Sequence, residues 1–362
     1  MASQVLYRKY RPKDFSEVIG QEHVVRPITN AIRMGKLAHA YLFSGPRGVG
    51  KTTIARLVAK AANCEGDNKP CNACSACVTF NDGRSLDLIE IDAASNTGVD
   101  DIRELREAVR FSPAGGNKKT YIIDEAHMLS KGSFNALLKT LEEPPEHAIF
   151  ILATTELDKV PATIISRTQH YDFRRPQMAD IVKRLKIVAG LEKIELMPQA
   201  AHTIAFVAEG SLRDAESTLG KILAIADKKV TEEEVNEILG VPRRALLREM
   251  LSSLGGREST RVIELVGELS HGGYDYDYAV KMLIQYFRNM LLLRIDPALA
   301  ELISQEMPEE DMVFIQEQGQ HFPDLRIKHA LATLIDALMN FKKSPIPQLP
   351  LELALLEIIQ KE

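Results

Sequence analysis

The feature that most constrains this chain is a glycine-rich segment, GPRGVGKT, at residues 45–52. An apolar run over residues 40–44 precedes it, and a helix-forming run follows it directly. This is the strand–loop–helix setting of a P-loop, in which backbone N–H groups and the positive end of a helix surround a phosphate. Lys51 would then reach the β- and γ-phosphates, and the Thr52 hydroxyl would bind Mg²⁺. A chance glycine-rich turn is the alternative, but every position of the pattern is filled, so we predict a nucleotide site.

Composition limits the number of domains and the kinds of partner. The chain has 362 residues, of which 45% are hydrophobic, and this predicts a sizeable core and two or three domains. Its net charge is −5, so a nucleic acid would have to be held by a local patch or by helix N-termini. We see no signal peptide and no apolar run of transmembrane length, so we expect a soluble, cytoplasmic protein with no membrane partner.

The four cysteines, Cys64, Cys71, Cys74 and Cys77, are clustered in one polar loop. In a reducing compartment such clustering indicates a metal site before it indicates disulfides. Four thiolates at this spacing suit tetrahedral Zn²⁺ and leave no open position for catalysis. Unpaired thiols, a redox Cys-x-x-Cys and an iron–sulfur cluster are the alternatives, but a loop with no core of its own needs a metal to hold it. We therefore predict a structural zinc module at residues 62–80.

Three further strands are expected before residue 160, and two of them end in polar side chains. LDLIEIDAAS (86–95) is predicted to be a buried strand, and KTYIIDEAH (119–127) delivers Asp124 and Glu125 at its C-terminal end, where open α/β sheets bind ligands. This tandem acidic pair resembles a Walker B motif, in which Asp124 would hold Mg²⁺ through water and Glu125 would orient and deprotonate the attacking water. AIFILATTE (148–156) is predicted to be another buried strand, ending in Thr154 and Thr155, and a threonine there either simply favours a strand or hydrogen-bonds the γ-phosphate or the attacking water.

The N-terminal segment mixes basic and aromatic residues before a helix expected over residues 22–34. It is either a nucleic-acid arm or a loop across the nucleotide base, with Val18 and Ile19 as apolar contacts and Arg8 or Arg11 near the phosphates. Proline, phenylalanine and glycine divide it into turns and leave no continuous basic face, which favours the loop.

Two arginines further along are candidates for phosphate contacts. Arg167 lies between a short helix and a last strand, and phosphoryl transfer benefits from a guanidinium brought in from outside the site. Arg213 opens a helix after the expected P-loop domain, where a second phosphate-sensing arginine would lie. Each could instead be an ordinary surface residue.

Beyond FRRPQ (173–177) the β signals vanish and the chain is expected to be helical. Helices are predicted over 179–190, 198–208 and 211–226, followed by TEEEVNEIL with Thr231 and Glu234 as a capping box. From residue 241 onward, apolar residues at 3.6 spacing predict a separate all-helical domain with no chemical motif. Such a domain serves more often as a core with an oligomer interface than as an enzyme domain.

Together these motifs identify a family. GPRGVGKTT, the four-cysteine insertion, LIEIDAAS, YIIDEAHML, SFNALLKTLEEPPEH, LATT, SR and GSLRDA occur in this order. In this the chain resembles the bacterial clamp-loader ATPases, the tau/gamma subunits of DNA polymerase III. The resemblance is dense over residues 4–226 and continues weakly to LELALLEII near residue 358.

The resemblance implies an α/β fold of the AAA+ class. We expect a P-loop parallel-sheet domain with a zinc-binding insertion at 1–176, a small helical lid at 177–240 and an all-α collar domain for oligomerisation at 241–362. It further implies an ATPase subunit of the DNA polymerase III holoenzyme, which uses ATP binding and hydrolysis to load the sliding clamp onto primed DNA. The implied partners are other copies of the chain and the delta and delta-prime subunits in a pentameric clamp loader.

The resemblance also assigns roles to residues. Thr155 matches sensor 1, Arg213 matches sensor 2, and Arg167 matches the arginine of a Ser-Arg-Cys motif that acts on ATP held by the neighbouring subunit, with Thr168 here in place of the cysteine. The predicted catalytic set is Lys51, Asp124, Glu125, Thr155, Arg167 and Arg213. The predicted ATP contacts are Gly45, Pro46, Arg47, Gly48, Val49, Gly50, Lys51, Thr52, Thr53, Arg11, Val18 and Ile19. The predicted metal ligands are Thr52 and Asp124 for Mg²⁺ and Cys64, Cys71, Cys74 and Cys77 for Zn²⁺.

Two alternative functions remain open. A non-hydrolysing structural subunit, like the loader's delta-prime arm, would be expected to have a degraded P-loop or Walker B motif, and here both are intact. A helicase-type AAA+ motor would fit a winged-helix or basic-patch signature, which we do not find. For a loader we expect helix N-termini near Thr97 and Lys131 to face the duplex backbone.

Overall fold

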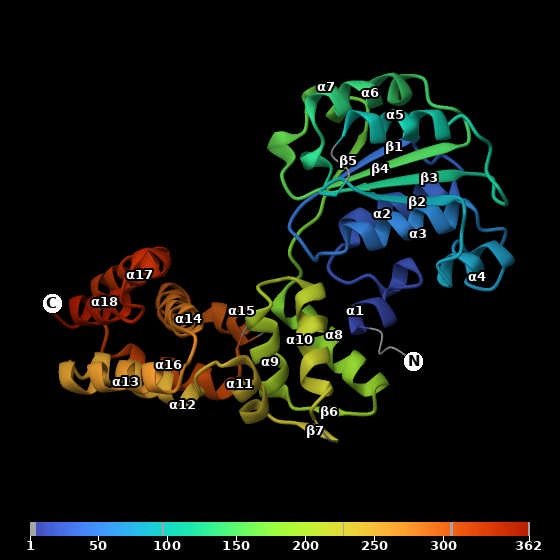
Figure 1. Ribbon diagram of the computed structural model, residues 1–362. Coiled ribbons are helices and arrows are strands. Elements are labelled where there is room, and N and C mark those ends of the chain that lie inside the picture. The colour runs from blue at the N-terminus through green and yellow to red at the C-terminus, as the bar shows by residue number, and fades with distance from the viewer. Residues whose placement is uncertain (1–4, 96–97, 227, 305–306, 361–362) are drawn as a thin grey trace. The chain divides into compact units, whose positions relative to one another are not determined.

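The computed structural model describes residues 5–95, 98–226, 228–304 and 307–360 (Figure 1). The chain divides into two compact units. The first comprises residues 1–184 and 208–217, and the second comprises residues 185–207 and 218–362. The first unit contains the glycine-rich segment and the acidic pair, so it carries the candidate site.

A parallel sheet of five strands forms the centre of the first unit (Figure 1). Its strand order is β2-β3-β4-β1-β5, so β1 and β4 lie side by side with Ser44 opposite Thr154. Because all the strands are parallel, the C-terminal ends of β1, β3 and β4 meet at one edge. The strands are β1 (Ala40–Ser44), β2 (Leu88–Asp92), β3 (Lys119–Asp124), β4 (Ala148–Thr154) and β5 (Gln169–Asp172).

The strand expected over residues 86–95 differs from the prediction. It is the short strand β2 at the edge of the sheet, and its side chains are half-buried or exposed, so the expectation of a buried strand is wrong. An edge strand has a neighbour on one side only, and a run of apolar residues does not reveal that position. The central strands β1 and β4 are buried along their whole length.

Helices cover both faces of the sheet (Figure 1). Successive side chains of a strand point to opposite faces, so Ile122 and Ile123 of β3 enter different cores. On one face Ile123 packs in the core that contains Phe134 of α6, and on the other Ile122 packs in the core that contains Ile54 of α3. The covering helices are α5 (Val99–Ala108), α6 (Lys131–Glu142) and α7 (Ala162–Ile165) on the first face, and α2 (Glu22–Arg33) and α3 (Lys51–Ala62) on the second.

Short elements connect these layers. The N-terminal segment forms α1 (Leu6–Lys9) and one 3₁₀ turn, η1 (Phe15–Glu17), in agreement with a segment divided into turns. The cysteine loop ends in α4 (Ser75–Asn81). Two further 3₁₀ turns follow the functional strands: η2 (Ala126–Met128) after β3 and η3 (Leu157–Lys159) after β4.

The helices predicted beyond residue 177 are present, and the capping box of Thr231 and Glu234 is confirmed by both of its hydrogen bonds. The expectation that strands vanish there is wrong, because β6 (Glu195–Leu196) pairs in parallel with β7 (Lys229–Val230). Two-residue strands are too short to show a period of two in the sequence. The helices are α8 (Met178–Leu191), α9 (Pro198–Val207), α10 (Leu212–Leu223) and α11 (Glu232–Leu239).

The rest of the second unit is helical in the part that the structure describes. Its core is apolar and continuous, with Leu283 and Phe287 of the long helix α14 fully buried. No helix in the described ranges is long and apolar enough to cross a membrane. The helices are α12 (Arg244–Gly255), α13 (Ser259–His271), α14 (Tyr276–Ile295), α15 (Ala300–Ser304), α16 (Glu309–Gly319), α17 (Asp324–Asn340) and α18 (Leu349–Gln360).

One ionic cluster is buried in this unit, and we call it the Arg244 cluster: Arg244, Arg248, Glu232 and Asp311. Arg244 is 9% exposed and pairs with Glu232 of α11 and with Asp311 of α16, which is fully buried. Arg248 also donates to Asp311, over 2.8 Å. Buried charges are tolerated when they are paired in this way. The cluster therefore joins α11 to α12 and α16.

Candidate active site and metal centre

The P-loop follows β1 with the backbone that its glycines allow. Gly45, Gly48 and Gly50 have φ values of 133°, 76° and 106°, a region that residues with a Cβ rarely adopt. Two of these glycines also lie against neighbouring groups. A Cβ on Gly45 would lie 2.3 Å from the carbonyl oxygen of Phe173, and one on Gly48 would lie 2.0 Å from Ser211 Oγ. The glycines therefore allow the backbone conformation of the loop, and a side chain at Gly45 or Gly48 would clash with a neighbouring group.

Lys51 is the first residue of α3, and its side chain lies inside the loop. It is 6% exposed, and its Nζ donates to the carbonyl oxygens of Gly45 and Pro46 over 2.6 and 2.7 Å. Burial lowers the pKa of Lys51, while the carboxylates of Glu125 and Asp124 act in the opposite direction. A buried ammonium at the start of a helix that follows a glycine-rich loop is suited to bind phosphate oxygens.

The helix α3 and the strand β3 bring two oxygen ligands together. Thr52 Oγ1 donates to Asp124 Oδ2 over 2.8 Å, and Asp124 Oδ1 accepts from the backbone N–H of Glu125 over 3.0 Å. A hydroxyl and a carboxylate at the end of a strand are the kind of ligands that Mg²⁺ takes alongside phosphates. The donor set therefore fits the predicted magnesium position.

Glu125 and Thr155 meet at the same edge of the sheet. Glu125 has a left-handed backbone, with φ at 49°, and its Oε2 accepts from Thr155 Oγ1 over 3.1 Å. The preceding threonine is used differently, because the Thr154 hydroxyl bonds to the backbone of Glu156 and to the ring of His127. Thr155, and not Thr154, thus contacts the acidic side chain proposed as the base.

Arg213 lies beside the P-loop at the start of α10. Its backbone N–H is 3.4 Å from the Gly48 carbonyl oxygen, and its guanidinium lies 4.8 Å from the centre of the Tyr7 ring. A hydrogen bond from Arg213 lowers the pKa of the Tyr7 hydroxyl. The fold therefore brings this arginine and the N-terminal helix α1 to the loop, although no sequence motif marks Tyr7.

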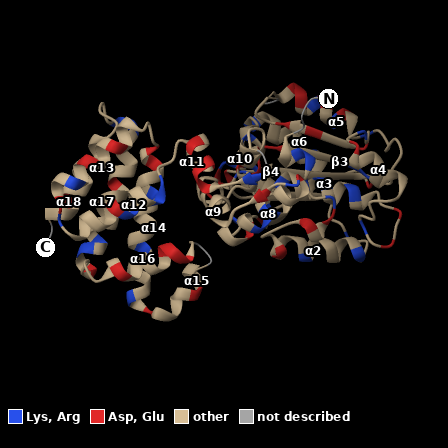
Figure 2. Ribbon diagram, turned by 90° about the horizontal axis from the view of Figure 1, so that it is seen from below, with Lys and Arg blue, Asp and Glu red and all other residues tan. Residues whose placement is uncertain are grey.

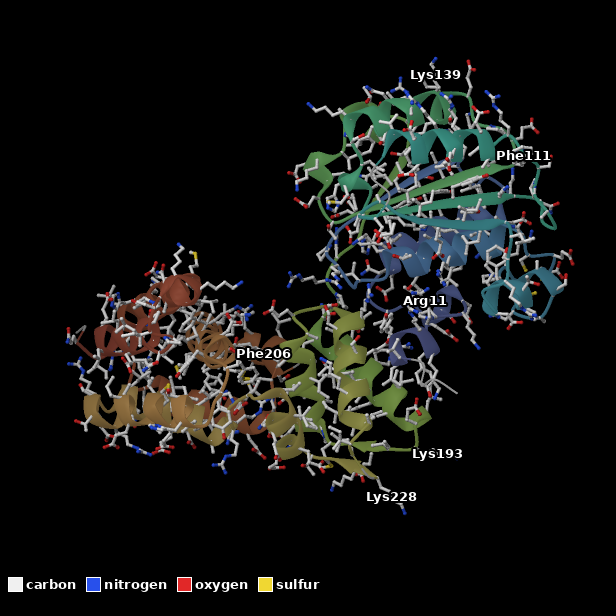
Figure 3. All side chains as sticks on the ribbon, in the orientation of Figure 1. Arg11, Phe111, Lys139, Lys193, Phe206 and Lys228 are labelled. Carbon is white, nitrogen blue, oxygen red and sulfur yellow. The ribbon has the colours of Figure 1, made fainter. Side chains whose placement is uncertain are left out.

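The residues predicted to contact the nucleotide besides the glycines, Lys51 and Thr52 differ in burial. Arg11, labelled in Figure 3, is half-buried, and burial followed by the positive charge of Arg56 lowers its pKa. The positive charges of Arg8 and Arg213 act on Arg11 in the same direction, so an anion nearby would be favoured. The remaining predicted contacts are Val18 and Ile19, which are half-buried, Arg47, which is exposed, Val49, which is buried, and Thr53, which is half-buried in α3.

Arg167 has its hydrogen bonds directed away from the P-loop and the acidic pair. Its guanidinium pairs with Glu142 of α6, with 2.7 Å between Nη2 and Oε1, and donates to the Thr163 carbonyl oxygen over 2.8 Å. Its other hydrogen bond in the described part of the chain is to Ser166 Oγ, so none reaches the P-loop or the acidic pair. The structure does not bring Arg167 together with this chain's own site.

The four cysteine side chains converge as a metal site requires. Their sulfur atoms all lie within 4.8 Å of one another. Backbone N–H groups point at three of them: Cys71 N donates to Cys64 Sγ, Cys74 N to Cys71 Sγ and Cys77 N to Cys74 Sγ, over 3.2, 3.3 and 3.5 Å. The N–H groups of Ala73 and Cys74 lower the pKa of Cys71 to about 6. The cluster is therefore compatible with a metal held by four thiolates.

A buried lysine that the sequence reading missed holds this loop to the sheet domain. Lys60 of α3 is 4% exposed, and its Nζ donates to the Lys13 carbonyl oxygen over 2.9 Å. It also donates to the side-chain oxygens of Asn72 and Asn81, on either side of the last two cysteines. Burial lowers the pKa of Lys60. Only the residue's place on the inner face of α3 could have signalled this role.

Two family models match the chain. One is described as "DNA polymerase III, delta subunit" and matches residues 20–177, and the other is described as "DNA polymerase III subunits gamma and tau domain III" and matches residues 230–362. Among solved structures, the Thermotoga maritima RuvB Holliday junction branch migration motor aligns with a TM-score of 0.48 at 20% identity, covering 67% of this chain and 78% of that one.

Curated relatives match along nearly the whole chain. DNA polymerase III subunit tau of Bacillus subtilis is 41% identical over 99% of this chain, which spans only 64% of that relative's length. DNA polymerase III subunit gamma of Buchnera aphidicola subsp. Acyrthosiphon pisum is 36% identical over 99% of both chains. On this evidence the chain belongs to the family of DNA polymerase III gamma and tau subunits.

Proposed function

We propose that the chain is the ATPase subunit of a DNA polymerase III clamp loader, which uses ATP binding and hydrolysis to load the sliding clamp onto primed DNA. The observation that carries the proposal is the meeting of Lys51, Thr52–Asp124 and Glu125–Thr155 at one edge of the sheet. The site lies in a chain that aligns with a gamma subunit over 99% of both lengths.

The chain's own residues divide the work of phosphoryl transfer. Lys51 exchanges its two carbonyl partners for β- and γ-phosphate oxygens, and Thr52 and Asp124 would hold Mg²⁺, whose charge offsets that of the phosphates. Glu125 accepts the proton of the attacking water. The Thr155 hydroxyl donates to the Glu125 carboxylate in this structure and, with ATP bound, contacts the γ-phosphate or the attacking water.

Arg213 and Arg167 serve the nucleotide from different subunits in this proposal. Arg213 stands at the P-loop and would sense the phosphates in its own chain as sensor 2. The Arg167 side chain is 35% exposed and bonds within the α6–α7 surface, which suits an arginine presented to ATP on the neighbouring subunit.

The cysteine cluster would hold Zn²⁺ in a structural role. Four thiolates close the coordination shell, and the Lys60 hydrogen bonds already fix the loop against α3. We further propose the division into a P-loop domain at 1–176, a lid at 177–240 and a collar at 241–362.

The collar would assemble copies of the chain with delta and delta-prime subunits into a pentamer in the cytoplasm. DNA would be held by local contacts, because the net charge is −5 and Figure 2 shows Lys and Arg interspersed with Asp and Glu along most helices. One proposed contact is the N-terminus of α6 at Lys131. The other, near Thr97, lies outside the described residues.

The test is ATP hydrolysis by the assembled complex. We expect the rate to rise when the clamp, primed DNA and the two partner arms are added together, and each omission should remove most of the rise. Unprimed single strands serve as the control for DNA. If the complete mixture hydrolyses ATP no faster than the chain alone, the loader function is wrong.

A non-hydrolysing structural subunit is the second candidate, because the family model over residues 20–177 carries a delta description. The intact contacts of Lys51, Asp124 and Glu125 argue against it. Hydrolysis by the purified chain that is lost in Glu125→Gln would eliminate this candidate.

A further inference from the structure

We propose that His127 is a positioning residue for Glu125, a role that rests on the proposed ATPase function and deepens it. His127 lies in η2, two residues after Glu125, and its side chain is only 7% exposed. Its ring stands between the acidic pair of β3 and the polar end of β4, within reach of both.

Both ring nitrogens have polar partners. Nδ1 lies 3.1 Å from Thr154 Oγ1 and 3.5 Å from Glu125 Oε2, and Nε2 lies 3.2 Å from Glu156 Oε1. A buried imidazole with a partner at each nitrogen has one favoured orientation, because rotation would leave polar atoms unpaired. The ring is thus held in one orientation beside the Glu125 carboxylate.

The Glu125 carboxylate needs neighbouring side chains that restrict its orientation. Its carboxylate is 32% exposed, so the chain itself leaves room for the side chain to turn toward solvent. A general base works only when it lies within hydrogen-bond reach of the water it deprotonates. On the described residues, the side chains that limit the carboxylate are Thr155, through a hydrogen bond of 3.1 Å, and His127. Thr155 donates to Oε2 from the position directly after β4, and His127 lies beside the same oxygen from η2.

The ring also contacts the segment that leads to Arg167. Glu156 is held by Lys159 of η3, with 2.7 Å between Nζ and Oε2, and the chain continues from η3 through α7 to Arg167. One side chain therefore contacts both the proposed base and the beginning of that segment. A shift of the C-terminal end of β4 would therefore move the His127 ring and, with it, the Glu125 carboxylate.

The experiment compares His127→Ala, His127→Asn and His127→Gln in the complete loader, with ATP binding and turnover measured separately. General base catalysis is worth roughly 10²–10⁴-fold, so loss of positioning alone should lower kcat by about tenfold to a hundredfold. ATP affinity should change by less than about threefold, since the ring does not contact the P-loop. Asparagine places an amide near Nδ1 and should recover part of the rate, whereas glutamine places its amide near Nε2 and should recover less.

His147 provides a matched control. It is half-buried and its Nε2 bonds to the Val109 carbonyl oxygen over 2.9 Å, away from the acidic pair. His147→Ala should cost stability without changing kcat. If His127→Ala does not fold, the asparagine and glutamine variants decide the matter, and wild-type kcat in both would overturn the proposal.

The deciding measurement is the double variant with Glu125→Gln, followed by single-turnover hydrolysis. If His127 acts through Glu125, its removal should lower the rate no further in that background. An equal loss in both backgrounds would show that His127 acts elsewhere and would overturn this proposal alone. A wild-type complex that does not hydrolyse ATP would overturn the proposed function itself.

Discussion

Gly48→Ala tests whether the P-loop is held in place by its contact with the start of α10. Gly48 has a φ of 76°, and an added Cβ would lie 2.0 Å from Ser211 Oγ and 3.0 Å from Ser211 Cβ. Ser211 is 8% exposed and its Oγ accepts from the Asp214 N–H over 3.2 Å, so the hydroxyl is not free to turn away. The loop or the start of α10 must therefore move.

The cost has two parts. A left-handed backbone costs a residue with a Cβ about 1–2 kcal/mol. Inserting an extra carbon into a packed contact costs typically about 1–3 kcal/mol. We therefore expect the free energy of unfolding of the first unit to fall by about 2–5 kcal/mol, with weaker ATP binding because Arg213 follows Ser211.

Urea unfolding of the wild type and four variants separates the two parts. Gly35→Ala is the control for strain alone, because Gly35 has a φ of 65° and no atom lies within 4 Å of an added Cβ. In a double-mutant cycle, Gly48→Ala and Ser211→Ala should show a favourable coupling of about 1–3 kcal/mol. A coupling near zero, or a Gly35→Ala variant as unstable as Gly48→Ala, would refute the reasoning.

Four further predictions concern the proposed site and its partners. Lys51→Ala should abolish or greatly weaken ATP binding, whereas Glu125→Gln should keep ATP bound and stop turnover, because an amide cannot accept the proton of water. Measurements of equilibrium ATP binding and of turnover check both variants, and wild-type turnover in Glu125→Gln would contradict the assignment of Glu125 as the general base. Metal analysis of protein purified under reducing conditions should find one Zn²⁺ per chain, and its removal should unfold the cysteine loop locally while ATP still binds. Arg167→Ala should leave ATP binding nearly intact and lower turnover of the complex by up to roughly 10³–10⁵-fold, and mixing it with Lys51→Ala subunits should restore some activity if the arginine acts on a neighbour. DNA binding by the complex should weaken steeply with salt and be indifferent to base sequence, which a strong preference for one duplex at fixed salt would contradict.

The sequence predicted the parts of the site that depend on local chemistry. The P-loop was evident because phosphate binding needs glycines with φ values that other residues avoid, and Gly45, Gly48 and Gly50 have such values. The buried strand before Asp124 and Glu125 was evident from its continuous apolar run, and the cysteine spacing was evident from the ligand chemistry. Each of these features is encoded by a short local stretch of the sequence.

Features that depend on long-range neighbours were missed. Tyr7 lies under Arg213, and the Lys60 ammonium bonds to Lys13 and to the cysteine loop, across separations that no local pattern records. The edge position of β2 and the pairing of β6 with β7 follow from tertiary arrangement. His127 has its role only because β3 and β4 are adjacent in the sheet.

The Arg244 cluster has a mechanical consequence. The connection from α11 to α12 is short and has no helix or strand of its own, so it would be a natural place for the chain to bend. Bending there would pull Glu232 away from Arg244, which would keep its pairing with Asp311 but lose one of its two carboxylate partners. The Arg244 pairings thus resist a change in the angle between α11 and α12, and they link a movement of α11 to α16 through Asp311.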